Sequence, residues 1–154
     1  MRGKKIAVWG LAFKPNTDDV RFAPSIAVVR SLLDEGAEVR AYDPEAMEKA
    51  KPVLPNITYC SDPYQAAEGA DAIVIVTEWD EFRQMDWRRL LSTVEHALII
   101  DGRNMFSPEE VSRRGFRYIS VGRPPVLHVQ NGSVAIEDSS LRGAQNRAGE
   151  PIFS

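Results

Sequence analysis

The residues that could do chemistry in this sequence gather in one long loop near the N-terminus. A short apolar run at residues 6–9 has the composition of a strand buried on both faces, and about a dozen residues follow before the next helical pattern begins. Connections of this type usually take about 2 to 6 residues, and longer ones tend to carry function. The loop holds two cations, Lys14 and Arg21, at the place where an open parallel sheet binds ligands. The ligand that this arrangement favours is an anion.

The sequence gives little support for metal binding or covalent catalysis. His96 and His128 are far apart in the sequence and lack companion cysteines at ligand spacing. Cys60, the single cysteine, would need a lowered pKa and a base to act as a nucleophile, and its place at the end of a short predicted strand offers neither. It is therefore interpreted as a half-buried core residue. The sequence also contains no nucleophile elbow.

The turn after the first predicted strand only partly resembles a dinucleotide-binding turn. Gly10 is in place, but Ala12 replaces the second glycine, which lets the backbone approach a pyrophosphate, and the third glycine is absent. Asp43 ends the second predicted strand, where a ribose-binding acid would stand. Because Pro44 follows it, a helix cap is the favoured role and a ribose contact the alternative. The pattern indicates a nucleotide-binding scaffold whose usual dinucleotide site has been rebuilt.

Strands and helices alternate along the chain. The predicted strands are residues 6–9, 38–42, 57–60, 72–77, 97–100 and 117–121. Helical patterns occupy residues 25–35 and 63–68, begin again near 45 and 107, and continue around 85–91. This alternation predicts an α/β fold, a single Rossmann-like domain with a doubly wound parallel sheet in three α/β/α layers.

Three predicted helix starts share one capping signal, an oxygen-bearing side chain followed directly by proline. The pairs are Asp43 with Pro44, Asp62 with Pro63, and Ser107 with Pro108. Gln65 and Glu110 are expected to reach back to the second and third caps. For the helix at 25–35, Pro24 fits the first turn and Gly36 is the expected left-handed terminator.

Composition and charge limit the classes of partner. The 154 residues are 44% hydrophobic and 27% charged, with a formal net charge of -3 and interspersed signs, which argues against nucleic-acid or anionic-membrane binding. No signal-peptide core and no apolar run of roughly 18 residues is present. A cytoplasmic location is therefore expected.

The composition changes after residue 123. Residues 1–123 are predicted to form the domain, and residues 124–154, which are rich in Pro, Gly, Ser, Asn and Gln, an irregular C-terminal tail. The alternative is a hairpin in which residues 126–129 pair with 134–136 around Asn131 and Gly132.

Four stretches of the sequence together carry a family resemblance. Residues 10–21 read GLAFKPNTDDVR and are followed by APS at 23–25; residues 41–44 read AYDP, residues 77–82 TEWDEF and residues 99–104 IIDGRN. In this order they resemble the C-terminal, UDP-binding domain of the UDP-glucose/GDP-mannose dehydrogenase family. The resemblance covers about residues 4–123, and the TEWxxF stretch favours the UDP-glucose 6-dehydrogenase branch.

The resemblance implies one part of a three-part enzyme. The family oxidises the C6 alcohol of a nucleotide sugar to a carboxylate with two NAD⁺, through a thioester on a cysteine. That cysteine, its supporting lysine and aspartate and the NAD fingerprint belong to N-terminal and central regions that this sequence does not contain. Cys60 does not match the nucleophile motif, so the chain is not expected to turn over substrate or to bind NAD alone.

The resemblance also assigns binding roles. Phe13 and Lys14 resemble contacts to the nucleotide sugar, Arg103 resembles the arginine that holds the same substrate, and Arg21 resembles the one that reaches NAD across the domain interface. An arginine offers a planar fork to phosphate and a lysine a compact charge. The alternative for each cation is a solvated surface charge. No catalytic residue and no metal ligand is assigned.

Other conspicuous residues are interpreted as structural. Asp18 and Asp19 are expected to brace the long loop through backbone hydrogen bonds. Trp79 either flanks the ligand cleft or anchors its own loop. Phe22 occupies a position where many relatives carry a polar or acidic residue, which leaves local interface contacts open.

The sequence is compatible with two functions. The first is the nucleotide-sugar-binding domain of an NAD-dependent UDP-glucose 6-dehydrogenase, which makes UDP-glucuronate for polysaccharide biosynthesis together with the NAD-binding and central dimerisation regions. The second is a free-standing, non-catalytic nucleotide or UDP-sugar binding module.

Overall fold

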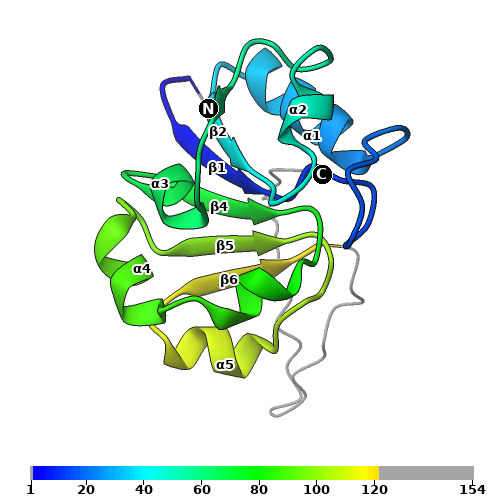
Figure 1. Cartoon of the computed structure of the whole chain (residues 1–154). Coiled ribbons are helices and arrows are strands. Elements are labelled where there is room, and N and C mark those ends of the chain that lie inside the picture. Colours follow the sequence, from blue (N-terminus) through cyan, green and yellow to red (C-terminus); the bar gives the residue numbers. More distant parts are fainter. Residues whose placement is uncertain (1, 122–154) are drawn as a thin grey trace. The chain divides into compact units, whose positions relative to one another are not determined.

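A computed structural model of the chain describes residues 2–121 (Figure 1). Six strands form one sheet in the order β3-β2-β1-β4-β5-β6. They are β1 (Lys5–Trp9), β2 (Glu38–Tyr42), β3 (Thr58–Tyr59), β4 (Ala72–Ile75), β5 (Leu98–Asp101) and β6 (Arg117–Ser120). The chain starts in the middle of the sheet, builds one half outward and then returns to build the other. This parallel, doubly wound order confirms the predicted fold class.

Helices cover both faces of the sheet. They are α1 (Pro24–Asp34), α2 (Met47–Ala50), α3 (Pro63–Ala67), α4 (Trp87–Thr93), α5 (Pro108–Arg113) and the 3₁₀ helix η1 (Asp80–Gln84). Because crossovers between parallel strands are right-handed, α1 and α2 lie on one face, and the reversal of direction after β3 puts α4 and α5 on the other. The helix α3 contacts β1, β2 and α4, so it shares the face of α4.

The core is built on strands that are buried on both sides. All four residues of β4 are buried, as is every residue of β1 except its first. Trp9 is fully buried and stacks on Phe82 with ring centroids 5.0 Å apart, while Tyr42 meets the edge of the same ring. This aromatic cluster attaches η1 to the sheet, just beyond the carboxyl end of β4.

The helix predicted at 25–35 is confirmed as α1, with both ends one residue earlier. The helix begins at Pro24 and is followed by Gly36 in a left-handed conformation, with φ of +89°. Asp62 and Ser107 cap α3 and α5 as predicted, by accepting hydrogen bonds from the third residue beyond. The predicted reach-back differs: Gln65 accepts from the backbone N–H of Ser61 rather than turning to Asp62. Glu110 does not turn back to Ser107 either: its Oε2 atom lies 3.6 Å from Nη2 of Arg114.

The predicted helix start at Asp43, Pro44 and Glu45 is wrong. The helix α2 begins only at Met47, and its cap position is Ala46. Asp43 Oδ1 accepts hydrogen bonds from the backbone N–H groups of Glu45 and Ala46, both at 2.8 Å, and so closes a turn. The reason is that the other carboxylate oxygen is already committed to the loop after β1, which holds the side chain at the end of β2.

Two predictions lie outside the described residues, the irregular tail at 124–154 and its alternative hairpin. His128 lies outside them as well. Within residues 2–121, none of the helices combines the length and the apolar character that a membrane crossing requires.

Candidate functional site

The predicted binding residues lie on loops that leave the same edge of the sheet. Phe13, Lys14 and Arg21 belong to the loop between β1 and α1, and Arg103 follows β5. Only β4 separates β1 from β5, and all three strands run parallel, so their carboxyl ends meet at one edge (Figure 1). Open α/β sheets bind ligands at this edge.

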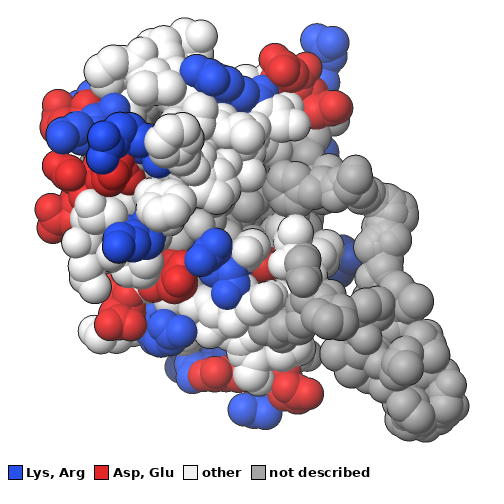
Figure 2. Space-filling model, turned by 90° about the vertical axis from the view of Figure 1, so that its right-hand side faces the viewer, with Lys and Arg blue, Asp and Glu red and all other residues white. Residues whose placement is uncertain are grey.

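Viewed toward this edge, uncharged side chains occupy much of the visible surface and basic side chains are scattered among them (Figure 2). No broad area of one charge sign is seen on the described part of this face. An anion bound here would therefore depend on a few individual cations rather than on a long-range field.

Gly10 lets two loops meet beyond β1 and β4. Its φ is +102°, and a Cβ atom built there would lie 2.5 Å from both the Cβ and the backbone nitrogen of Thr77. This close approach allows the Thr77 hydroxyl to donate a 2.7 Å hydrogen bond to the carbonyl oxygen of Ala12. The glycine is needed for contact between loops.

Asp43 joins the ends of three strands. Its Oδ2 atom accepts hydrogen bonds from the backbone N–H groups of Leu11 at 2.7 Å and Ala12 at 3.0 Å, and from the indole of Trp79 at 3.0 Å. With the two bonds to Oδ1, this fully buried carboxylate meets N–H donors on both oxygens, as a buried charge requires. The loop-anchor interpretation of Trp79, which is 8% exposed, is confirmed.

These contacts change what the turn after β1 can bind. In a dinucleotide-binding domain the N–H groups of this turn face the pyrophosphate. Here the N–H groups of Leu11 and Ala12 face Asp43 instead. The residues present therefore do not fit NAD at this turn, and Asp43 has neither of the two roles considered from the sequence, ribose contact or helix cap.

The rest of the loop after β1 is closed by local bonds. The Phe13 N–H donates to the carbonyl of Asp19 at 2.7 Å. Asp19 braces the loop as predicted, because its Oδ1 accepts from the Arg21 backbone N–H at 2.8 Å. Asp18 instead faces the side chain of Lys49, with Oδ2 and Nζ 3.6 Å apart.

Arg21 is held by its neighbour. Its Nε and Nη2 atoms donate to the two oxygens of Asp19, both at 3.0 Å. The side-chain hydrogen bond from Arg21, together with its backbone N–H, lowers the pKa of Asp19 to about 2. The Arg21 side chain is 81% exposed, so the pair lies in solvent.

Three further residues of this loop present their side chains to solvent. Phe13 is 47% exposed, and Lys14 is exposed and has no hydrogen bond or ion pair with another residue in the range 2–121. Phe22 is 95% exposed and has a left-handed backbone, with φ of 60°. The loop therefore exposes one cation and two aromatic rings to solvent.

The loop after β5 is shaped by a second buried aspartate. Asp101 Oδ1 accepts from the backbone N–H of Arg103 at 2.9 Å. Its Oδ2 accepts from the N–H groups of Met105 and Phe106 and from the Tyr118 hydroxyl. The backbone position of Arg103 is therefore defined by a fully buried carboxylate.

Sequence reasoning missed the partner of the Arg103 side chain. Arg103 Nε donates to Glu78 Oε1 at 2.8 Å, with the two side chains 39% and 32% exposed. Burial by itself raises the pKa of the Glu78 carboxyl, but hydrogen bonds from Arg103 and the backbone and the charges of Arg103 and Arg83 lower it overall. The sequence could have suggested this ion pair, because Glu78 and Arg103 each follow one of two strands predicted to be parallel.

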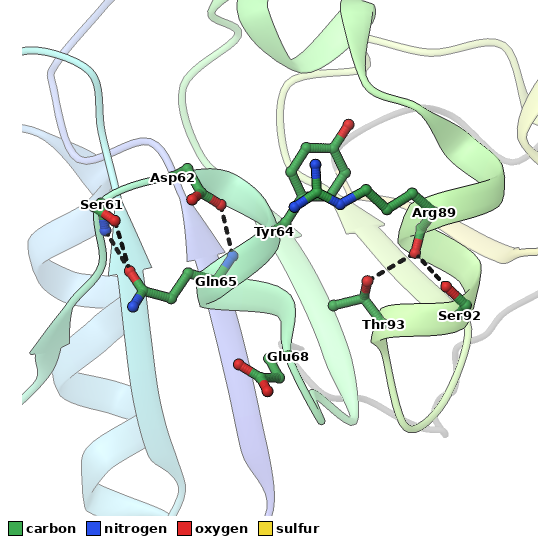
Figure 3. Close-up of a pocket in the computed structure, with 8 residues that line it drawn as sticks. All are labelled: Ser61, Asp62, Tyr64, Gln65, Glu68, Arg89, Ser92 and Thr93. Carbon is green, nitrogen blue, oxygen red and sulfur yellow. Dashed lines mark hydrogen bonds between the residues drawn. The ribbon is translucent and has the colours of Figure 1, made fainter.

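A pocket of about 530 Å³ lies elsewhere, between α3 and α4 (Figure 3). It is lined by Ser61, Asp62, Tyr64, Gln65, Glu68, Arg89, Ser92 and Thr93. The Arg89 guanidinium covers the ring of Tyr64 at 3.8 Å from its centroid. None of the four predicted binding residues lines this pocket, so the structure does not unite them there.

No group of three or more His, Cys, Asp or Glu side chains within residues 2–121 could hold a metal ion. His96 Nδ1 lies 2.8 Å from Asp71 Oδ1. Cys60 is buried, and burial raises the pKa of its thiol. A thiol in this environment is not an activated nucleophile.

Comparison with known proteins agrees with this description. Residues 7–108 match the model of the "UDP-glucose/GDP-mannose dehydrogenase family, UDP binding domain". A UDP-glucose 6-dehydrogenase from Rhizobium meliloti is 55% identical over 124 residues, and one from Pseudomonas aeruginosa is 43% identical over 133 residues. A UDP-glucose dehydrogenase structure from Pyrobaculum islandicum superposes with a TM-score of 0.65 at 38% identity and covers 77% of this chain.

These relatives are much longer than the matched part. The chain spans 28% of the Rhizobium protein, 29% of the Pseudomonas protein and 25% of the Pyrobaculum chain. The matched residues include both the loop after β1 and the loop after β5, up to the start of α5. The chain belongs to the UDP-glucose/GDP-mannose dehydrogenase family, as its UDP-binding domain.

Proposed function

We propose that this domain binds the nucleotide sugar of an NAD-dependent UDP-glucose 6-dehydrogenase. The observation that carries the proposal is that the family match, residues 7–108, includes both cation-bearing loops at the carboxyl edge of the sheet. The 55% identity to a UDP-glucose 6-dehydrogenase favours UDP-glucose as the substrate and UDP-glucuronate, a precursor for polysaccharides, as the product.

The proposed roles follow the chemistry of the side chains. Arg103 binds an oxyanion of the nucleotide sugar with its planar guanidinium, and Lys14 supplies a compact charge near the sugar, where Phe13 adds an apolar contact. Arg21 contacts NAD bound by the rest of the enzyme. The described domain supplies no thiol for chemistry, so turnover requires NAD-binding and central dimerisation regions of the kind that the longer relatives have room for.

One observation favours a second candidate. Within residues 2–121 the thiol of Cys60 is buried and burial raises its pKa, so the described domain offers a binding surface without an activated nucleophile. The alternative is a free-standing nucleotide or UDP-sugar binding module. Supplying the remaining regions of a full-length relative separates the two, because only the first candidate predicts NADH formation from UDP-glucose and NAD⁺.

The direct test is calorimetric titration of the chain with UDP, UDP-glucose and GDP. Uridine nucleotides are expected to bind. Arg103→Ala is expected to weaken their binding free energy by about 1.5 kcal/mol or more, the value for a hydrogen bond to a charged group. Arg113→Ala, on the exposed side of α5, is the matched control and should leave the affinity unchanged. No binding of any of the three nucleotides at about 1 mM, or equal binding by the Arg103 variant, would contradict the proposal.

A further inference from the structure

We infer that Glu78 is a positioning residue that aims Arg103 at the phosphate-bearing ligand. This inference rests on the proposed function. Glu78 follows β4 and Arg103 follows β5, which are paired neighbours in the sheet. The 2.8 Å bond from Arg103 Nε to Glu78 Oε1 therefore joins two loops at the carboxyl edge.

Arg103 is held at both ends. Its backbone N–H is bound by Asp101, which is fully buried and accepts three further hydrogen bonds. Its side chain is bound at Nε by Glu78. A long side chain fixed in this way has already lost the rotamer freedom that ligand binding would otherwise have to remove.

The bond to Glu78 occupies only the Nε atom of the Arg103 guanidinium. Within residues 2–121, the terminal nitrogens Nη1 and Nη2 of Arg103 have no hydrogen bond to another residue, and the side chain is 39% exposed. These two nitrogens form the fork that binds two oxygens of a phosphate or carboxylate in parallel. The geometry presents a fork that is oriented before the ligand arrives.

A carboxylate beside an arginine could also act in the opposite sense. Glu78 cancels part of the charge that an anion meets, so it could compete with a phosphate for Arg103. Two substitutions separate these effects. Glu78→Gln keeps an oxygen acceptor and removes the charge, whereas Glu78→Ala removes both.

The experiment is titration of the whole chain with UDP, with uridine as a ligand that lacks phosphate. Positioning predicts that Glu78→Ala weakens UDP by about tenfold, equal to 1.4 kcal/mol, and that Glu78→Gln restores the affinity to within about threefold of the unaltered chain. The affinity for uridine should not change in either variant. Glu48→Ala, which removes an exposed carboxylate paired with Lys51, is the control for the loss of an ion-paired carboxylate.

A double variant tests whether Glu78 acts through Arg103. In the Arg103→Ala background, Glu78→Ala should cause no further loss, because the two residues act as one unit. An equal loss in both backgrounds, or tighter binding by both Glu78 variants, would overturn the inference. If Glu78→Ala does not fold, tighter UDP binding by Glu78→Gln alone overturns it, and affinity within threefold supports it.

The two proposals fail in different ways. If the unaltered chain does not bind UDP, the proposed function is wrong and positioning is wrong with it. If the unaltered chain binds UDP and Arg103→Ala weakens it while Glu78→Ala does not, only the role of Glu78 is wrong.

Discussion

At the scale of single residues, Gly10 combines two demands that another residue cannot meet. Its backbone is left-handed, and a Cβ atom would fall 2.5 Å from atoms of Thr77. Gly10→Ala is expected to lower the free energy of unfolding by about 2 to 4 kcal/mol, from backbone strain and overpacking together. Urea denaturation measures the change.

Gly3 provides the control for Gly10. Its φ is +80°, but no atom lies within 4 Å of the position that a Cβ would take. Gly3→Ala should therefore show only the cost of the left-handed backbone, about 1 kcal/mol. Equal losses at the two positions would show that the contact with Thr77 is unimportant.

Phe22 should behave in the opposite way. Its side chain is 95% exposed, and its φ of 60° is strained for any residue with a Cβ. Phe22→Gly is expected to raise the free energy of unfolding of the chain by about 0.5 to 1 kcal/mol, because glycine adopts this conformation freely. Phe22→Ala keeps the strain and should show no such gain, and a gain in both variants would assign the effect to the lost ring instead.

At the scale of elements, Asp43 connects the end of β2 to the loops after β1 and β4. Both oxygens act as acceptors. The N–H groups of Leu11, Ala12 and Trp79 face Oδ2, and two backbone N–H groups of the turn after β2 face Oδ1. Asp43→Asn replaces one carboxylate oxygen with an NH₂ donor. The backbone or indole N–H groups that face this oxygen then lose their acceptor. The free energy of unfolding is expected to fall by about 3 kcal/mol or more.

The prediction for Asp43 is checked by urea denaturation and by Trp fluorescence. The fluorescence should report greater exposure of the indole that Asp43 now binds, because Trp79 is 8% exposed. Asp34→Asn, at the exposed end of α1, is the matched control and should change the stability little. A stable Asp43→Asn variant with an unchanged spectrum would show that the loops are held by other contacts.

At the scale of the whole molecule, acid should destabilise the domain. The folded state lowers the pKa of Asp19 to about 2 from 3.8 and also lowers the pKa of Asp71 and of Glu78. Such groups stabilise the folded state fully above their unfolded pKa, and the contribution is lost as the pH falls toward the folded value. The free energy of unfolding should therefore decrease from about pH 5 to pH 2. Denaturation at a series of pH values tests this, and salt should weaken the part due to the solvent-exposed Asp19–Arg21 pair.

Alkali should destabilise the domain for the opposite reason. Burial raises the pKa of Tyr59 from 10.0 to about 12, and burial followed by the hydrogen bond to Glu81 raises the pKa of Tyr42. A raised pKa contributes stability that is complete below the unfolded value and is lost as the pH rises toward the folded one. Stability should fall above about pH 10, and Tyr59→Phe should make that fall shallower. An unchanged alkaline limb in this variant would show that Tyr59 does not contribute.

The sequence by itself determined the order of the elements, the doubly wound sheet and the family. These features are local: the apolar run of β1, the caps at Asp62 and Ser107 and the turn at Gly36 all depend on residues within a few positions of one another. The loop that carries Lys14 was also predictable, because its length and composition are local properties. Short spacing did not settle every contact, because Gln65 and Glu110 do not turn back to the caps that precede them.

Only the tertiary structure decided what Asp43, Trp79 and Glu78 do. Asp43 meets donors that are 31, 32 and 36 positions away, and Glu78 meets Arg103 across 25 positions. The sequence predicted that these residues would reach one edge of the sheet, but not which oxygen would face which N–H group. That choice depends on strand order and on the close approach at Gly10, which bring loops that are distant in the chain within hydrogen-bonding distance.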